Sequence, residues 1–165
     1  MPAPTKRPFR IVVLASGEGT TFEHLAEEFS RQAPKGRRIE IAAVVSNNHN
    51  AGVLARAAAR GIPAVSIGHQ GLSNEEHSRR VAAAVREYGP DLIVMAGYLR
   101  VLSREFIDGF DGRVINVHPA LLPKHGGPGM YGRHVHEAVL ANHETESGAS
   151  VHWAIPRVDG GATIS

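Results

Sequence analysis

Short apolar runs alternate with amphipathic segments along almost the whole chain, and this alternation limits the fold more than any other feature. Strands that alternate with helices form parallel sheets, with the connecting helices packed on both faces. We therefore predict an α/β fold with a doubly wound, mostly parallel sheet. The predicted strands span residues 11–15, 39–45, 64–67, 92–96, 114–117 and 150–155. The predicted helices span residues 22–32, 51–60, 73–88, 103–107 and 131–142.

The size and composition of the chain suit one cytoplasmic domain. Its 165 residues fit a single domain over residues 1–165, with residues 1–9 as a loose N-terminal arm. The chain has no cysteine, which excludes disulfides, thiolate metal sites and a cysteine nucleophile. Its formal net charge is only +2, and no apolar run is long enough for a membrane span. We expect a cytoplasmic protein that binds neither nucleic acid nor membranes.

A turn rich in Gly and Thr follows the first predicted strand. Gly17 and Gly19 allow backbone N–H groups to approach a ligand, while Thr20 and Thr21 can donate hydroxyl hydrogen bonds. Such a turn can hold a phosphate, or it can be a plain strand-to-helix turn with a Thr cap. A dinucleotide site is disfavoured, because the second strand ends at residues 46–48 without an acid to hold a ribose.

Asn116 and His118 lie two positions apart on the fifth predicted strand, so their side chains leave the same face of the sheet. They stand at the carboxyl end of that strand, where open α/β sheets bind ligands. An Asn amide N–H can stabilise an oxyanion, and a His can transfer a proton near neutral pH. The alternative is a polar strand end in which both side chains merely bind loop backbone.

The ten histidines do not predict a metal site. His134 and His136 are two apart in a predicted helix, so they point to different faces and cannot easily share a metal. His152 shares a strand face with Ser150, and we expect it to support Asn116 from behind or simply to be a buried, hydrogen-bonded side chain. Six others read as loop or surface residues: His24, His49, His69, His77, His125 and His143.

Ordered sequence blocks resemble the folate-dependent formyltransferases, and most closely the branch that formylates glycinamide ribonucleotide in purine synthesis. The resemblance covers nearly the whole chain from Arg10. Its blocks lie at residues 12–17, 45–47, 90–102, 116–123, 148–153 and 159–161. It implies a Rossmann-like formyltransferase fold and direct transfer of formyl from 10-formyltetrahydrofolate to an amine. No metal is implied, and the protein would be a monomer or a homodimer.

The same resemblance implies roles for individual residues. Asn116 would bind the formyl oxygen, His118 would act as general acid, and Asp159 would orient His118 and stabilise its charged form. The substrate phosphate and the rest of glycinamide ribonucleotide would contact Gly17, Gly19, Thr20, Thr21, Gly97, Leu99 and Pro119. The folate would contact Tyr98, Arg100, Val101, Leu102, Asn116 and Val158. Core packing is the alternative for Val101 and Leu102.

The chain departs from the family pattern at three places. Relatives usually carry Asn at the position of Thr21, and many carry a basic residue near Glu75. The sequence also stops at Ser165, where relatives continue with a further strand and a long helix, so we expect that this strand and helix are missing.

Other functions stay open on the sequence alone. Methionyl-tRNA or sugar formyltransferases and formyltetrahydrofolate hydrolases carry related motifs, but Pro119 and the phosphate turn favour the purine enzyme. A ligand-binding module without activity is the alternative from a different class.

Overall fold

A computed structural model describes residues 7–31 and 38–165 and contains a six-stranded sheet with the strand order β3-β2-β1-β4-β5-β6. Strands β1 to β5 run parallel to their neighbours, while β6 is antiparallel to β5. The strands are β1 (Phe9–Leu14), β2 (Ile39–Ser46), β3 (Ala64–Ser66), β4 (Leu92–Ala96), β5 (Val114–His118) and β6 (Ser150–Trp153). This confirms the predicted doubly wound, mostly parallel α/β fold.

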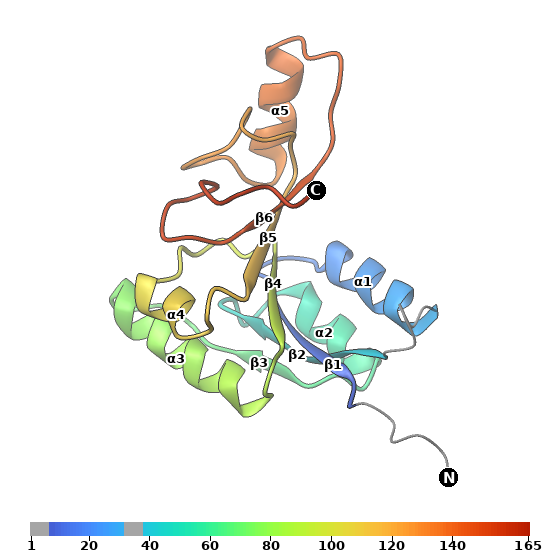
Figure 1. The fold of residues 1–165 in the computed structure, drawn as a ribbon, viewed down its shortest axis with the longest axis vertical. Coiled ribbons are helices and arrows are strands. Elements are labelled where there is room, and N and C mark those ends of the chain that lie inside the picture. The colour runs from blue at the N-terminus through green and yellow to red at the C-terminus, as the bar shows by residue number, and fades with distance from the viewer. Residues whose placement is uncertain (1–6, 32–37) are drawn as a thin grey trace.

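Helices cover both faces of the sheet, as Figure 1 shows. On one face, α1 and α2 bury side chains such as Phe22 and Val53 against β1 and β2. On the other face, α3 and α4 bury Val81, Val85 and Phe106. The helices are α1 (Thr20–Arg31), α2 (Gly52–Ala59), α3 (Asn74–Glu87), α4 (Arg104–Asp108) and α5 (Arg133–Ala141). Every predicted helix is present, with ends that differ by one to two residues over the described part of the chain.

The predicted loose arm is wrong at its inner end. Phe9 and Arg10 belong to β1, because Phe9 pairs with Ile39 of β2 and the backbone N–H of Arg10 donates to Asp91 at 2.9 Å. Arg7 forms an ion pair with the same carboxylate at 2.6 Å. Residues 1–6 of the predicted arm lie outside the described residues, as does residue 32 at the predicted end of α1.

Helix α3 shows why one prediction about the histidines is wrong. Ser73 caps the helix by accepting a hydrogen bond from the backbone N–H of Glu76 at 3.1 Å. From this start, residues 77, 78, 81, 82 and 85 form the buried stripe of the helix. His77 is therefore a core residue rather than a surface one, and its Nε2 atom lies 3.2 Å from the carbonyl oxygen of Ile67.

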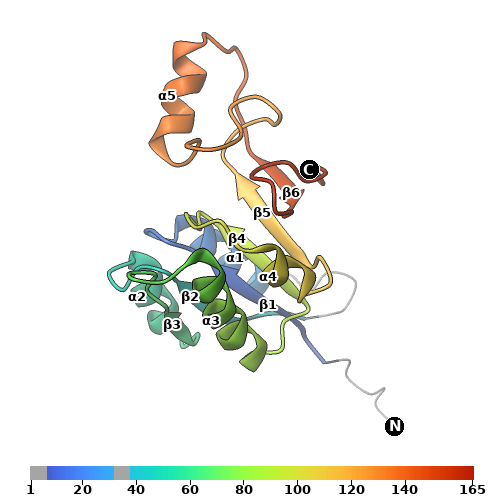
Figure 2. The same ribbon diagram turned by 90° about the vertical axis from the view of Figure 1, so that its left-hand side faces the viewer.

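The part of the chain after β5 projects from the carboxyl end of that strand. Figure 2 shows α5 and its flanking loops beyond the end of β5, while β6 and the C-terminal segment lie beside that strand. The predicted sixth strand is shorter than expected and ends at Trp153. Among the described residues, no helix has the length and apolar character needed to cross a membrane. Because β1, β4 and β5 are parallel neighbours, their carboxyl ends lie at one edge of the sheet, next to this projecting segment.

Candidate active site

Strand pairing brings Asn116 and His118 together with residues of β6. Asn116 is directly opposite His152, and His118 is opposite Ser150, in the antiparallel β5–β6 ladder. Residues opposite each other on neighbouring strands project to the same face, so the four side chains form one group. His118, Ser150 and His152 are buried, while Asn116 is half-buried. Asn116 Nδ2 lies 3.1 Å from His152 Nε2.

Asp159 joins this group from the loop that follows β6. Its φ of 51° is a left-handed conformation, which Asp tolerates better than most residues. The carboxylate accepts a hydrogen bond from Asn116 Nδ2 at 3.4 Å and lies 3.5 Å from His118 Nδ1. It also accepts from the backbone N–H of Gly127 at 2.9 Å. The three residues predicted to carry the chemistry are thus neighbours in space, although Asp159 lies 43 positions after Asn116 along the chain.

Both ring nitrogens of His118 face acceptors. Its Nε2–H donates to the carbonyl oxygen of His125 at 2.7 Å, and its Nδ1 faces the Asp159 carboxylate. An imidazole with an acceptor on each side can donate a hydrogen bond from either ring nitrogen. The arrangement can therefore hold a proton donor beside an amide N–H donor, which is the pair that a developing oxyanion needs.

Ser150 shapes the loop that follows His118. Its hydroxyl donates to the carbonyl oxygen of Ala120 at 2.8 Å and accepts from the backbone N–H of Leu122 at 3.0 Å. The loop backbone is thereby bound to the start of β6. Pro119, predicted to contact substrate, lies at the beginning of this loop and is half-buried.

The predicted phosphate turn joins β1 to α1. Gly19 has φ of 77°, and a side chain there would meet Val53 of α2 at 2.5 Å, so only glycine fits. Gly17 is open, with nothing within 4 Å of the position of a Cβ atom. Thr20 begins α1, so the backbone N–H groups of Thr20 and Thr21 belong to the first helical turn, where N–H groups have no partner within the helix. The turn therefore has the form of an anion site.

The charge of Glu23, in the first turn of α1, would oppose an anion at this turn. Arg60 Nε donates to Glu23 Oε1 at 2.8 Å, and Arg56 lies 3.8 Å from the same carboxylate. The hydrogen bond from Arg60 holds the pKa of Glu23 below its ordinary value, with the charges of Arg60 and Arg56 acting in the same direction. Two guanidinium groups on α2 and its end thus offset this acidic side chain.

Ser16 connects three strand ends beside the turn. Its hydroxyl donates to Asn47 Oδ1 at 2.5 Å and accepts from the backbone N–H of Leu99 at 2.8 Å. Its own N–H donates to the carbonyl oxygen of Gly97 at 3.0 Å. Ser16, at the end of β1, therefore ties the ends of β2 and β4 together. Sequence reasoning noticed the turn but missed this role, because a Ser followed by Gly gives no sign of long-range partners.

The segment after β4, predicted to bind folate, has a mixed character. Leu99 and Val101 are about half exposed, while Leu102 is 5% exposed and packs in the core. Leu102 is therefore a core residue, which agrees with the alternative interpretation of this position. Tyr98 is buried, and burial raises the pKa of its hydroxyl above the ordinary value. Val158, predicted to lie near the folate, is exposed on the loop that carries Asp159.

Several buried polar atoms near this segment lack a partner within the described residues. Tyr98 Oη and Arg100 Nε are two of them, and Nδ1 atoms of His69 and His77 are two more. His69 and His77 are in ring contact, with centroids 6.0 Å apart. Unpartnered buried polar atoms are unusual in proteins, and they are typical of sites that take a ligand or water.

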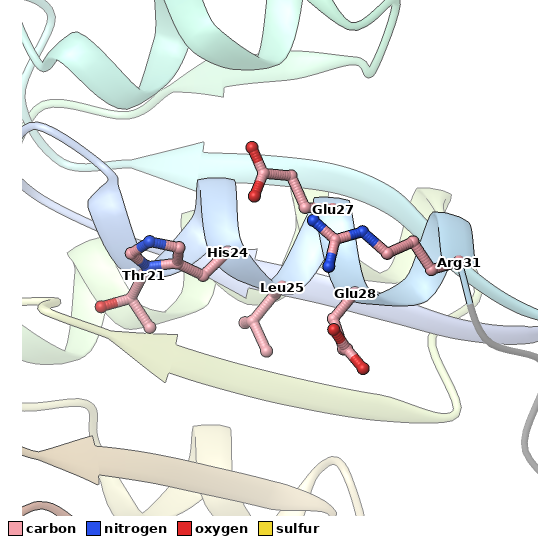
Figure 3. Close-up of a pocket in the computed structure, with 6 residues that line it drawn as sticks. All are labelled: Thr21, His24, Leu25, Glu27, Glu28 and Arg31. Atoms are coloured by element: carbon pink, nitrogen blue, oxygen red, sulfur yellow. The ribbon is translucent and has the colours of Figure 1, made fainter.

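A separate hollow lies on the outer surface of α1. Figure 3 shows its lining residues along one side of that helix, with Thr21 and His24 at one end and Arg31 at the other. Its other lining residues are Leu25, Glu27 and Glu28. Of the predicted site residues only Thr21 borders it, so it is not where Asn116, His118 and Asp159 meet. Within residues 7–31 and 38–165, no group of three or more His, Asp or Glu side chains is arranged to hold a metal ion.

Two backbone groups of the site could not be found from residue type. The His125 carbonyl and the Gly127 N–H contact His118 and Asp159, and any residue can supply such groups. The stretch from residue 126 to residue 132 is rich in Gly, which gives no sign of these two contacts. The sequence predicts His125 to be a loop or surface residue. It lies in a loop, but its side chain is only 9% exposed.

Comparisons with known proteins identify the family of the chain. The formyl transferase family pattern matches residues 9–165. Phosphoribosylglycinamide formyltransferase of Escherichia coli (strain K12) is 36% identical over 155 residues, covering 93% of this chain and 69% of that protein. The trifunctional purine biosynthetic protein adenosine-3 of Drosophila melanogaster is 35% identical over 161 residues, covering 97% of this chain and 12% of that protein.

Solved structures show the same relationship. The phosphoribosylglycinamide formyltransferase of Coxiella burnetii superposes with a TM-score of 0.84 at 38% identity, over 96% of this chain and 71% of that chain. That of Brucella melitensis gives a TM-score of 0.82 at 35% identity, over 97% and 78%. The chain therefore belongs to the formyl transferase family, within its phosphoribosylglycinamide formyltransferase branch.

Proposed function

We propose that this chain transfers the formyl group of 10-formyltetrahydrofolate to the amine of glycinamide ribonucleotide, a step of purine synthesis. The observation that carries the proposal is the convergence of Asn116, His118 and Asp159 at the carboxyl end of β5. Family membership alone would not identify the catalytic residues, and a polar cluster alone would not identify the reaction. The two together favour formyl transfer over hydrolysis and over tRNA or sugar substrates, since the relatives carry the phosphoribosylglycinamide name.

The reaction needs an oxyanion donor and a proton donor. The amine nitrogen attacks the formyl carbon, and the π electrons of the carbonyl move onto its oxygen. An N–H of Asn116 would stabilise this oxyanion. When the C–N bond to the folate breaks, the leaving nitrogen gains a proton and the attacking nitrogen loses one. His118 would supply the first proton as general acid, and the proton that the attacking nitrogen loses would return to His118, whose charged form Asp159 would support.

The remaining residues would hold the two substrates. The turn at Gly17 and Gly19 would bind the phosphate with its backbone N–H groups, helped by the hydroxyls of Thr20 and Thr21. Gly97, Leu99 and Pro119 would line the ribonucleotide, between the turn and His118. On the folate side, the unpartnered donors of Tyr98 and Arg100 support a ligand with polar groups, and half-exposed Val101 offers apolar contact. Leu102 would contact the folate from the core, and Val158 would contact it from the loop that carries Asp159.

We place the reaction in the cytoplasm and expect a monomer or homodimer that binds these small molecules without a metal. The test is an assay of the purified chain with both substrates, in which mass spectrometry follows formylglycinamide ribonucleotide and absorbance follows the released folate. Product that depends on both substrates supports the proposal. Formate released without the ribonucleotide would indicate a hydrolase, and binding of either ligand without turnover would indicate a binding module.

A further inference from the structure

His152 is almost completely buried behind Asn116, and its two ring nitrogens have different partners. Nδ1 lies 3.0 Å from the carbonyl oxygen of Trp153, and Nε2 lies 3.1 Å from Nδ2 of Asn116. A carbonyl oxygen can only accept, so Nδ1 carries the hydrogen. In the neutral ring, Nε2 then has a free lone pair and accepts from the Asn116 amide. The tautomer of His152 thus determines that Nδ2, rather than Oδ1, of Asn116 faces inward.

Three atoms form a nearly equilateral triangle at this point. Asn116 Nδ2 is 3.1 Å from His152 Nε2 and 3.4 Å from Asp159 Oδ1, and these two acceptors are 3.4 Å apart. The acceptors therefore subtend an angle of about 63° at Nδ2. The two hydrogens of a planar amide diverge by roughly 120°, so they cannot both align with these acceptors. The contact to His152 is the shorter of the two, so one N–H of Asn116 forms its hydrogen bond with His152 rather than with Asp159.

From this geometry we propose that His152 is a positioning residue that holds one N–H of Asn116, so that the other N–H is presented to the formyl oxygen. The inference rests on the proposed function for the identity of that oxygen, but the hydrogen bond itself does not. Without an acceptor at Nε2, both N–H groups of Asn116 would compete for Asp159, and the amide could rotate. An amide that rotates would offer Oδ1, which repels an oxyanion, for part of the time.

The direct test is NMR of the ¹⁵N-labelled chain, which needs no turnover. The His152 ring should be protonated at Nδ1 and unprotonated at Nε2, with a coupling across the hydrogen bond to the Asn116 amide. A ring protonated at Nε2, or the absence of that coupling, would overturn the proposal. As a control for burial, His77→Met replaces another buried histidine, on α3, and should leave the Asn116 amide signals unchanged. Equal disturbance by His77→Met and His152→Met would also overturn it.

The kinetic test separates positioning from general stability. His152→Met should lower kcat by about 10- to 100-fold and change KM little, because the amide acts on the transition state. His152→Gln keeps an acceptor oxygen near the position of Nε2 and should recover most of the loss. In an Asn116→Ala background, His152→Met should lower kcat by less than about 2-fold further. If the two losses multiply instead, His152 does not act through Asn116.

The outcomes for the two proposals are distinguishable. If the unsubstituted chain transfers no formyl group but shows the expected ring tautomer and coupling, the proposed function fails while the hydrogen bond stands. If it transfers formyl and His152→Met leaves kcat unchanged, the proposed function stands and the role of His152 fails. His152→Gln and the NMR of the unsubstituted chain remain informative if His152→Met does not fold.

Discussion

His118 Nδ1 lies 3.5 Å from Asp159 Oδ2, and both side chains are almost excluded from solvent, at 3% and 7% exposed. A buried carboxylate is costly unless hydrogen bonds or a charge offset it. Asp159 has three such contacts, from His118, Asn116 and the Gly127 N–H. The pair is therefore a specific arrangement for keeping a negative charge next to an imidazole, in a part of the molecule with little water.

Replacing Asp159 with Asn removes this charge with little change of shape. We expect kcat to fall by about 10²-fold or more, because the charged form of His118 loses its partner. Asp111→Asn is a matched control, since Asp111 has nearly the same backbone conformation, with φ of 54° against 51°, but is exposed. Steady-state kinetics of both variants decide the matter. Equal activity of the two variants would reduce Asp159 to a turn residue.

Removing the amide of Asn116 tests the oxyanion donor. Asn116→Ala should lower kcat by roughly 10²- to 10³-fold, the usual cost of one oxyanion donor. The free energy of unfolding should fall by no more than about 1–3 kcal/mol, the cost of leaving the buried Nε2 of His152 without its partner. Asn142→Ala, at the exposed end of α5, is the control and should retain normal turnover. Near-normal kcat in Asn116→Ala would remove this residue from the chemistry.

The phosphate turn needs a variant that the fold tolerates. Gly19→Val is unsuitable, because a Cβ atom at Gly19 would clash with Val53 and φ is positive. We expect even Gly19→Ala to lower the free energy of unfolding, by about 1–3 kcal/mol. Gly17→Ala has free space and should keep stability while weakening glycinamide ribonucleotide binding. Calorimetry with each substrate checks this. Unchanged ribonucleotide affinity in Gly17→Ala would argue against a phosphate at that point of the turn.

The hydroxyl of Ser16 should matter for stability. Ser16→Ala would leave the Leu99 N–H and buried Asn47 without their partner, at a cost of about 1–3 kcal/mol. Ser30→Ala, whose hydroxyl binds one exposed helix carbonyl, should cost less than about 0.5 kcal/mol. Denaturant unfolding of both variants measures the difference. Equal stability of the two variants would mean that Ser16 does not tie the strand ends.

His77 should make stability depend on pH. Its folded-state pKa lies below the ordinary 6.5, first because burial disfavours the charged form and then because Arg100 and His69 repel it, while the Ile67 carbonyl opposes this. The unfolded chain therefore binds a proton that the folded chain refuses, and stability is lost as pH falls below about 6.5. His77→Met should flatten the slope of unfolding free energy between pH about 6.5 and 5. Exposed His136→Gln should not.

The framework of the fold could be predicted because its signals are local. Runs such as residues 92–96 are apolar over a strand length, and Ser73 with Glu76 marks a helix start. Phe9 and Arg10 were missed because polar neighbours hide a strand whose partners lie in β2 and near Asp91. His77 was missed because a polar residue on a buried helical stripe looks like a surface residue until the stripe is traced.

The site could be predicted only in part for a related reason. Asn116 and His118 share a strand, so their common face follows from sequence spacing. That Asp159 reaches them follows from the resemblance to relatives, because the path of the loop after β6 is not encoded by any local pattern. The contacts of His125 and Gly127 come from backbone atoms, to which residue identity gives no clue.

The two backbone contacts to the loop also affect how affinities should be interpreted. His118 Nε2–H already donates to the His125 carbonyl, and Asp159 already accepts from the Gly127 N–H. A substrate group that uses either atom exchanges one hydrogen bond for another, so its net gain is smaller than the ~0.5–1.5 kcal/mol of a typical bond. Binding energy measured for this site therefore reports a competition between ligand and chain. Substitutions in the loop that weaken these two contacts would raise the affinity for substrates, although the substituted residues would not contact the substrates.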